Sequence, residues 1–180
     1  MSDHAKKFVD HLHALKLNNR GALAVLRRSL AFPPGSYPPA YPFVERFVPV
    51  DSHAQDGRRL SLYLSAALYA IHPESAEQGF AASLGKLFIA LDKRPSLEQR
   101  FVALLGTDAE GLPDHLRQAV SLLAAAGIGF DHAALADDLT PWLQPNFTRY
   151  PERLEAIRQR WARDYYRNAL TGNAPDSAPN

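Results

Sequence analysis

Cysteine is absent from this chain of 180 residues. Disulfide scaffolds, cysteine-ligated zinc, iron–sulfur clusters and thiol catalysis are therefore excluded. A chain without cysteine suits a reducing compartment, and we expect a cytoplasmic location.

Long hydrophobic runs are missing as well. The longest weakly polar stretch, residues 119–130, is too short to cross a bilayer. We therefore expect a soluble protein with no membrane partner. With 46% hydrophobic and 22% charged residues, the composition is typical of a globular domain with a substantial core.

The alternation of apolar and polar residues that marks half-buried strands is nearly absent, and apolar residues recur instead at helical spacing. We predict an all-α, compact multi-helix bundle of about eight helices. Two helical halves are possible, residues 1–94 and 95–170, followed by a disordered tail over residues 171–180. Asn19 is expected to cap a helix over residues 20–31, and Asp131 another. Ser96 and Gln99 have the spacing of a capping box.

Five prolines fall within residues 32–42, a segment that we interpret as a surface loop or extended arm. A peptide ligand for a proline-recognising module is the alternative interpretation of this segment.

Signals for catalysis are weak throughout. Gly79 and Gly85-Lys86 suggest a phosphate-binding loop, but five residues separate the glycines and Leu87 stands where a magnesium-binding hydroxyl is needed. We interpret this segment as a helix whose small residues pack against a neighbour. The seven histidines include no pair at i, i+4 that suits a metal, and no serine lies in a nucleophile elbow. The sequence predicts no metal site, no cofactor and no enzymatic activity.

Charge is distributed unevenly, although the net charge is only +1. Acidic residues predominate over residues 108–138, whereas arginines gather in residues 20–28 and 149–167. Arg20 and Arg27 are nearly two helical turns apart, so we expect them to project together. In the last helix, arginines follow the side opposite the apolar stripe that contains Trp161. Such surfaces could bind a polyanion or an acidic protein, or be merely solvated, with Arg160 paired to Asp164.

Read in order, several segments resemble a known family, the small subunit (CasB family) of the type I-E CRISPR Cascade complex. The resembling segments lie within residues 8–167. They are Arg20-Gly-Ala-Leu-Ala-Val-Leu-Arg-Arg28, the proline-rich stretch through Tyr41, Tyr69-Ala-Ile-His-Pro73, Ser83-Leu-Gly-Lys86, Ser96-Leu-Glu-Gln-Arg-Phe101, Leu112-Pro-Asp-His-Leu-Arg117, Asp138-Leu-Thr-Pro-Trp142 and Arg158-Gln-Arg-Trp-Ala-Arg-Asp-Tyr165.

The resemblance implies an all-helical, non-catalytic subunit that occurs in pairs within a crRNA-guided complex. Its implied partners are crRNA, the displaced strand of the target DNA and other Cascade subunits. The resemblance places the basic face at Arg20, Arg27, Arg28, Lys86, Arg100 and Arg117, to which we add Arg158, Arg160 and Arg163 from the last helix.

Some of these residues have a structural alternative. Arg100 could equally be an ion-pair partner within the fold, and arginines near Trp161 could anchor packing. The small net charge favours binding that depends on the assembled complex. The alternative function is an architectural helical adaptor whose arginines bind acidic protein partners.

Overall fold

The computed structural model describes residues 2–144 and 151–170, a part of the chain that contains helices and no strand. The all-α fold is thereby confirmed. Three short 3-10 turns accompany the helices, at Ser29–Ala31, Pro38–Ala40 and Glu45–Phe47. The α-helices of the described part are α1 (Asp3–Asn18), α2 (Arg20–Arg28), α3 (Tyr41–Val44), α4 (Gly57–Ile71), α5 (Phe80–Ala90), α6 (Pro95–Gly106), α7 (Leu112–Ala126), α8 (His132–Trp142) and α9 (Pro151–Leu170). The predicted tail over residues 171–180 lies outside the described residues, as does Arg149.

Local hydrogen bonds explain where several helices begin. The side chain of Asn19 accepts a hydrogen bond from the Ala22 amide at 3.0 Å, and Asp131 caps α8 in the same way, as predicted. The capping box predicted at Ser96 is wrong. The α6 helix begins one residue earlier, at Pro95, because proline has a helix-compatible φ and lacks the amide that a cap would satisfy.

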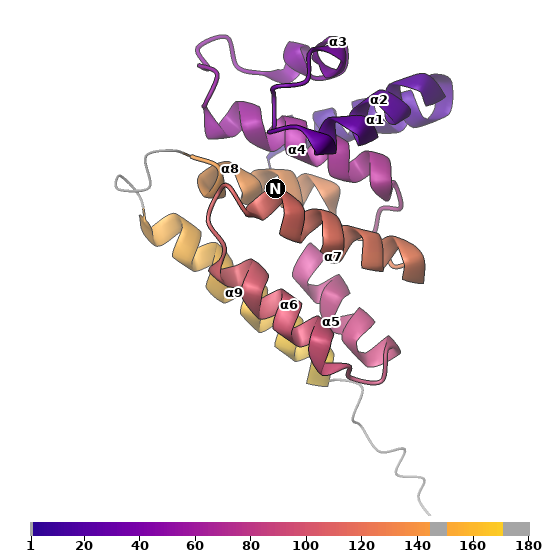
Figure 1. Cartoon of the computed structure of the whole chain (residues 1–180), viewed down its shortest axis with the longest axis vertical. Helices are drawn as coiled ribbons and strands as arrows, with labels where there is room; N and C mark the ends of the chain where they lie inside the picture. Colours follow the sequence, from indigo (N-terminus) through magenta and orange to yellow (C-terminus); the bar gives the residue numbers. More distant parts are fainter. Residues whose placement is uncertain (1, 145–150, 171–180) are drawn as a thin grey trace, which may run out of the picture.

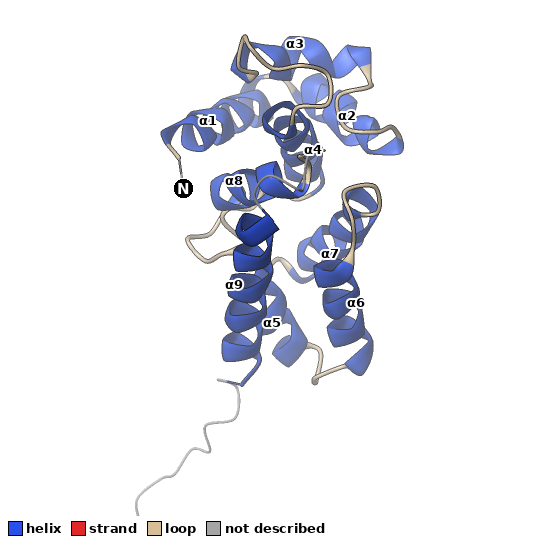
Figure 2. Cartoon of the chain, turned by 90° about the vertical axis from the view of Figure 1, so that its left-hand side faces the viewer, coloured by secondary structure: helices blue, strands red, loops and turns tan. Residues whose placement is uncertain are grey.

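The α4 helix is the central element of the fold (Figure 1). Every residue from Leu60 to Ala70 is buried. One side of α4 packs with α1, α2 and α3 around a core that contains Phe8, Leu26 and Tyr69. Its other side joins a larger core with α5 to α9. Figure 2 shows α1 to α3 above α4, and α5, α6 and α9 at the opposite end of the molecule. The boundary near Arg94 between two halves stays a prediction.

The α5 helix packs closely against α9 at the end of the molecule opposite α1 to α3 (Figure 2). A Cβ atom on Gly85 would clash with the carbonyl oxygen of Tyr165, so only glycine permits this approach. The interpretation of the glycine-containing segment as a packed helix is confirmed. Tyr165 also stacks on Phe101 of α6, with ring centroids 4.0 Å apart. These contacts fix α5, α6 and α9 relative to one another, and thereby position the exposed side chains that these helices carry.

The proline-rich segment is a loop that contains one 3-10 turn, as the proline content predicts. The guanidinium of Arg59 fixes it in place by donating to the Gly35 carbonyl oxygen at 3.3 Å and to Glu45 at 2.7 Å. Tyr63 donates to the same Glu45 oxygen at 2.6 Å. Burial alone would raise the pKa of Glu45, but the hydrogen bonds from Tyr63 and Arg59 outweigh it and lower the pKa. Glu45 therefore stays ionised and keeps the loop attached to α4.

Candidate nucleic-acid interface

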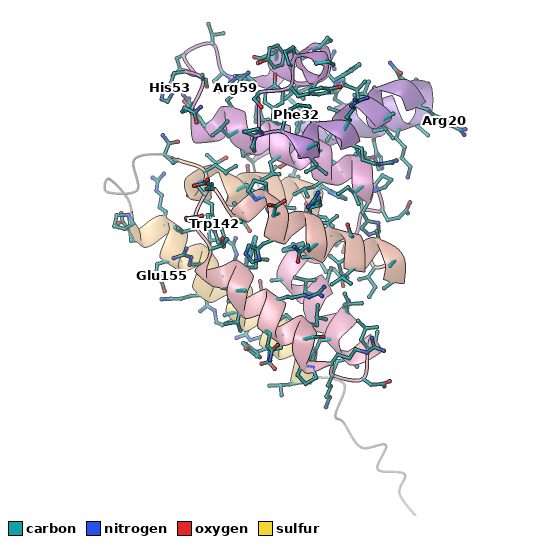
Figure 3. All side chains as sticks on the ribbon, viewed as in Figure 1. Arg20, Phe32, His53, Arg59, Trp142 and Glu155 are labelled. Carbon is teal, nitrogen blue, oxygen red and sulfur yellow. The ribbon has the colours of Figure 1, made fainter. Side chains whose placement is uncertain are left out.

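The arginines of α2 separate into two environments. Arg20 opens the helix directly after its cap and is exposed, and Arg28 ends the helix and is exposed as well. Neither forms an ion pair or hydrogen bond with another residue of the described ranges. Figure 3 shows Arg20 extending from the corner between α1 and α2 into solvent.

Arg27 is exposed as well, but its guanidinium bonds a neighbouring helix. Its Nε and Nη2 atoms donate to the carbonyl oxygen of Ala70, at 3.0 and 2.7 Å. Ala70 lies in the last turn of α4, where backbone carbonyls lack intrahelical partners. The joint projection expected for Arg20 and Arg27 stays a prediction, since both are exposed and only Arg27 bonds the end of a neighbouring helix. Its contact with nucleic acid stays a prediction.

The arginines of α9 that flank Trp161 are engaged by neighbouring helices. Arg158 Nη2 donates to the Thr107 carbonyl oxygen at 3.0 Å, and its guanidinium lies 5.3 Å from the ring centre of Trp142. Arg160 pairs with Asp138, rather than with Asp164 as considered from the sequence. Asp138 also accepts a hydrogen bond from Trp161 Nε1 at 2.8 Å. These two arginines anchor α9 to α6 and α8.

Two further predicted residues have partners close in sequence. Lys86 donates to Gln78, and Arg117 pairs with Asp114 at 3.2 Å. Both cations are exposed, so their charges still reach solvent. An exposed ion pair such as Arg117–Asp114 stabilises a protein by less than about 1 kcal/mol, and a phosphate can compete for it.

Arg100 and Arg163 are exposed and have no ion pair or hydrogen bond within the described part of the chain. Arg100 borders a narrow space between α6 and α7, beside His115 and Gln118. Arg163 lies on the side of α9 opposite the buried Trp161.

The structure therefore divides the predicted basic face into three groups. Two unpaired arginines lie on α2, whereas Arg100 lies on α6 and Arg163 on α9, helices that Figure 1 shows on the other side of α4 from α2. The remaining five predicted cations already contact the protein: Arg27, Lys86, Arg117, Arg158 and Arg160.

Arg94 and Arg167 meet the same criteria as the unpaired arginines, although they are not among the predicted site residues. Both are exposed and have no ion pair or hydrogen bond with another described residue. Arg167 follows Arg163 by one helical turn, so the spacing along α9 was the signal that could have identified it. Arg94 immediately precedes α6, where no periodic pattern marks it.

His132 is buried between Tyr69 and Phe130, with ring centroids 5.0 and 4.2 Å away. Burial lowers the pKa of His132 to about 4, so its imidazole is neutral near pH 7.

Among residues 2–144 and 151–170, no group of three or more histidines or carboxylates could hold a metal ion. No helix in these ranges has the length and hydropathy needed to cross a membrane.

The sequence of this chain matches a family model described as CRISPR-associated protein Cse2, over residues 22–166. The chain belongs to the Cse2 family. A curated Cse2 protein of Thermus thermophilus is 38% identical over 163 residues, which span 89% of each chain. The matched span includes every predicted site residue except Arg20.

Solved structures support the same assignment to the Cse2 family. The crystal structure of CasB from M. ruber has a TM-score of 0.76 and 28% identity, and covers 96% of this chain and 97% of its own. A chain of a structure named CRISPR RNA-guided surveillance complex has a TM-score of 0.75 and 25% identity, with 93% and 94% covered. The resemblance to the CasB family is confirmed.

Proposed function

We propose that this chain is the non-catalytic small subunit of a crRNA-guided type I-E CRISPR surveillance complex. In that complex it binds the nucleic-acid backbone without sequence specificity and stabilises the R-loop through the displaced strand. Membership of the Cse2 family supports this proposal, as does the similarity to a chain of an RNA-guided surveillance complex.

The observation that carries the proposal is the set of exposed, unpaired arginines on rigid helices: Arg20, Arg28, Arg100 and Arg163. A guanidinium that already bonds the protein must lose that contact before it binds a phosphate, whereas these four can bind at once. Guide pairing supplies sequence specificity in such complexes, so a subunit that contacts only phosphates suffices.

Spacing on α2 suits a strand that follows the helix. Arg20 and Arg28 are eight residues apart, which corresponds to about 12 Å along a helix. Two guanidinium groups at this separation can bind different phosphates of one strand. Because the net charge is only +1, long-range attraction is weak, and tight binding depends on the assembled complex. We expect two copies of the chain to lie side by side there.

The test compares two double variants with the same loss of charge. Arg20→Gln/Arg28→Gln removes two unpaired cations. Lys6→Gln/Lys16→Gln removes two that pair with Asp3 and Glu74. Binding of a labelled single-stranded DNA is measured against salt concentration, for the isolated chain and for the assembled complex. Each lost phosphate contact should lower the slope of log affinity against log salt by about 0.7.

The arginine variant should therefore lose about 1.4 in slope, while the lysine variant keeps the slope of the unmodified chain. If the arginine variant keeps the slope of the unmodified chain, α2 is not the contact. If neither the chain nor the complex shows a salt-dependent affinity, backbone binding is refuted.

The alternative is an architectural helical adaptor whose arginines bind acidic protein partners. The exposed, unpaired Arg20 and Arg28 suit this function too, because a guanidinium pairs with a carboxylate as well as with a phosphate. Under this function, Arg28→Glu should prevent assembly with the other subunits, whereas any complex that does assemble should capture DNA normally.

A further inference from the structure

A cleft of about 640 Å³ lies between the proline-rich loop, the start of α4 and the start of α7. None of the predicted cations lines it. Its apolar lining includes Phe32, Pro34, Leu60 and Leu143. The volume falls within the range of about 300–1,000 Å³ that is typical of ligand-binding pockets. We call this feature the acidic cleft, because Glu110 is the one charged residue of its described lining that has no ion-pair partner there.

The loop side of the acidic cleft is held in one conformation. Arg59 fixes the loop through its bonds to Gly35 and Glu45, and its guanidinium packs on the ring of Tyr63 at 4.8 Å. Phe32, which is 42% exposed, stacks on Tyr37 with ring centroids 4.7 Å apart. Figure 3 shows Phe32 and Arg59 in the same upper part of the molecule. A preformed wall lowers the entropic cost of binding.

Charge decides what the acidic cleft can accept. Glu110 and Asp114 line it on the α7 side, and both are exposed. Asp114 has Arg117 as its partner, but Glu110 has no ion pair or hydrogen bond within the described residues. Arg59, the one cation among the described residues that line the cleft, is neutralised by Glu45. A phosphate in this cleft would face an uncompensated carboxylate, so the acidic cleft repels the polyanion that the arginines attract.

We propose that the acidic cleft is a docking site for an extended segment of another protein subunit, one in which a lysine or arginine is flanked by apolar side chains. The basic side chain pairs with Glu110, and an apolar neighbour covers Phe32 and Leu60. This proposal rests on the proposed function, because it assigns the segment to a neighbouring subunit of the same complex.

The apolar lining and the carboxylate of Glu110 together indicate which kind of segment binds in the acidic cleft. The apolar lining provides favourable burial, and the exposed Phe32 is an aromatic residue of the kind enriched at interfaces. The carboxylate at the rim selects a cationic partner and disfavours an anionic one. The arginines on α2 and α9 thus remain available to nucleic acid while the acidic cleft holds the chain in its assembly.

The first experiment identifies the occupant in the assembled complex. Gln55 lines the acidic cleft and is exposed, so a photo-crosslinking p-benzoylphenylalanine at this position reports on whatever fills it. We expect a cross-link to a different protein subunit, within a segment that contains a lysine or arginine beside apolar residues. Cross-links to nucleic acid or to a second copy of this chain would overturn the proposal, as would no cross-link in a complex that retains the chain.

The second experiment uses Glu110→Lys and, as a matched control, Glu77→Lys. Glu77 is exposed between α4 and α5, outside the acidic cleft. The concentration of chain needed to reconstitute the complex is measured by native mass spectrometry. We expect an increase of about tenfold for Glu110→Lys and less than about twofold for the control, since like charges across an interface disfavour binding. Binding of single-stranded DNA by the isolated chain should not weaken in either variant.

Circular dichroism checks that both variants fold. If Glu110→Lys does not fold, the cross-link from Gln55 decides the outcome. A chain that enters the complex equally well with Glu110→Lys refutes the docking site and leaves the proposed function intact. An unmodified chain that never enters the complex refutes both.

Discussion

Arg27 of α2 binds the carbonyl oxygen of Ala70 at the end of α4 through two hydrogen bonds, from Nε and Nη2. The next residue, Arg28, has no ion pair or hydrogen bond among the residues that the structure describes. Adjacent arginines of one motif thus differ in what they do: one joins two helices, and the other remains available to a partner.

Arg27→Gln should lower the free energy of unfolding by about 1–2 kcal/mol, because it removes charge-assisted hydrogen bonds to the end of a helix. Arg28→Gln is the matched control and should change stability by less than about 0.5 kcal/mol. Urea denaturation of both variants measures the difference. Equal midpoints would show that the contact with Ala70 contributes nothing.

Asp138 holds Arg160 and Trp161 together, and two substitutions separate these contacts. Asp138→Asn keeps an oxygen for Trp161 Nε1 but loses the ion pair, for a cost of about 0.5–1 kcal/mol. Asp138→Ala also leaves the buried indole N–H without an acceptor, which should cost about 1–3 kcal/mol more. Urea unfolding followed by tryptophan fluorescence compares them. If the two variants are equally stable, the bond to Trp161 is unimportant.

Gly85→Ala should destabilise the chain by about 1–3 kcal/mol, because the added methyl group would clash with the Tyr165 carbonyl oxygen in α9. Gly106→Ala provides the control, since nothing lies within 4 Å of a Cβ at that position. There the substitution should be neutral or stabilise α6 by up to about 1 kcal/mol. Thermal unfolding of both variants checks the contrast, and a neutral Gly85→Ala would contradict the close packing of α5 on α9.

His132 should make stability depend on pH. Burial lowers its pKa from 6.5 to about 4, so between these values the unfolded state binds more protons than the folded state. The free energy of unfolding should therefore fall as the pH falls from about 6.5 to 4, by roughly 3 kcal/mol for this residue. Below pH 4 this contribution is constant.

His132→Gln cannot titrate, so its unfolding free energy should change less over that pH interval. His4→Gln, at an exposed position, should retain the pH dependence of the unmodified chain. Denaturation at several pH values tests this expectation, and identical pH profiles for all three proteins would rule out His132 as the cause.

Helices could be predicted well from the sequence because their causes are local. Apolar residues at helical spacing located α4 and α9, and the short polar side chains of Asn19 and Asp131 located two helix starts. The capping-box prediction failed because Ser96 competes with the adjacent Pro95, which sets the first turn. The acidic cleft was not predicted, since its lining comes from residues 30–36, 54–60, 109–114 and 143.

The sequence by itself determined the all-α class, the absence of cysteine chemistry, and which residues carry positive charge. Only the tertiary structure decided which of those charges are available. Arg27 finds its acceptor 43 residues away, and Arg160 pairs with Asp138, 22 residues earlier, rather than with Asp164 one turn along the same helix. Helical periodicity gives the direction in which a side chain leaves its helix. The atoms that it meets there belong to distant segments, and the packing of those segments determines its partner.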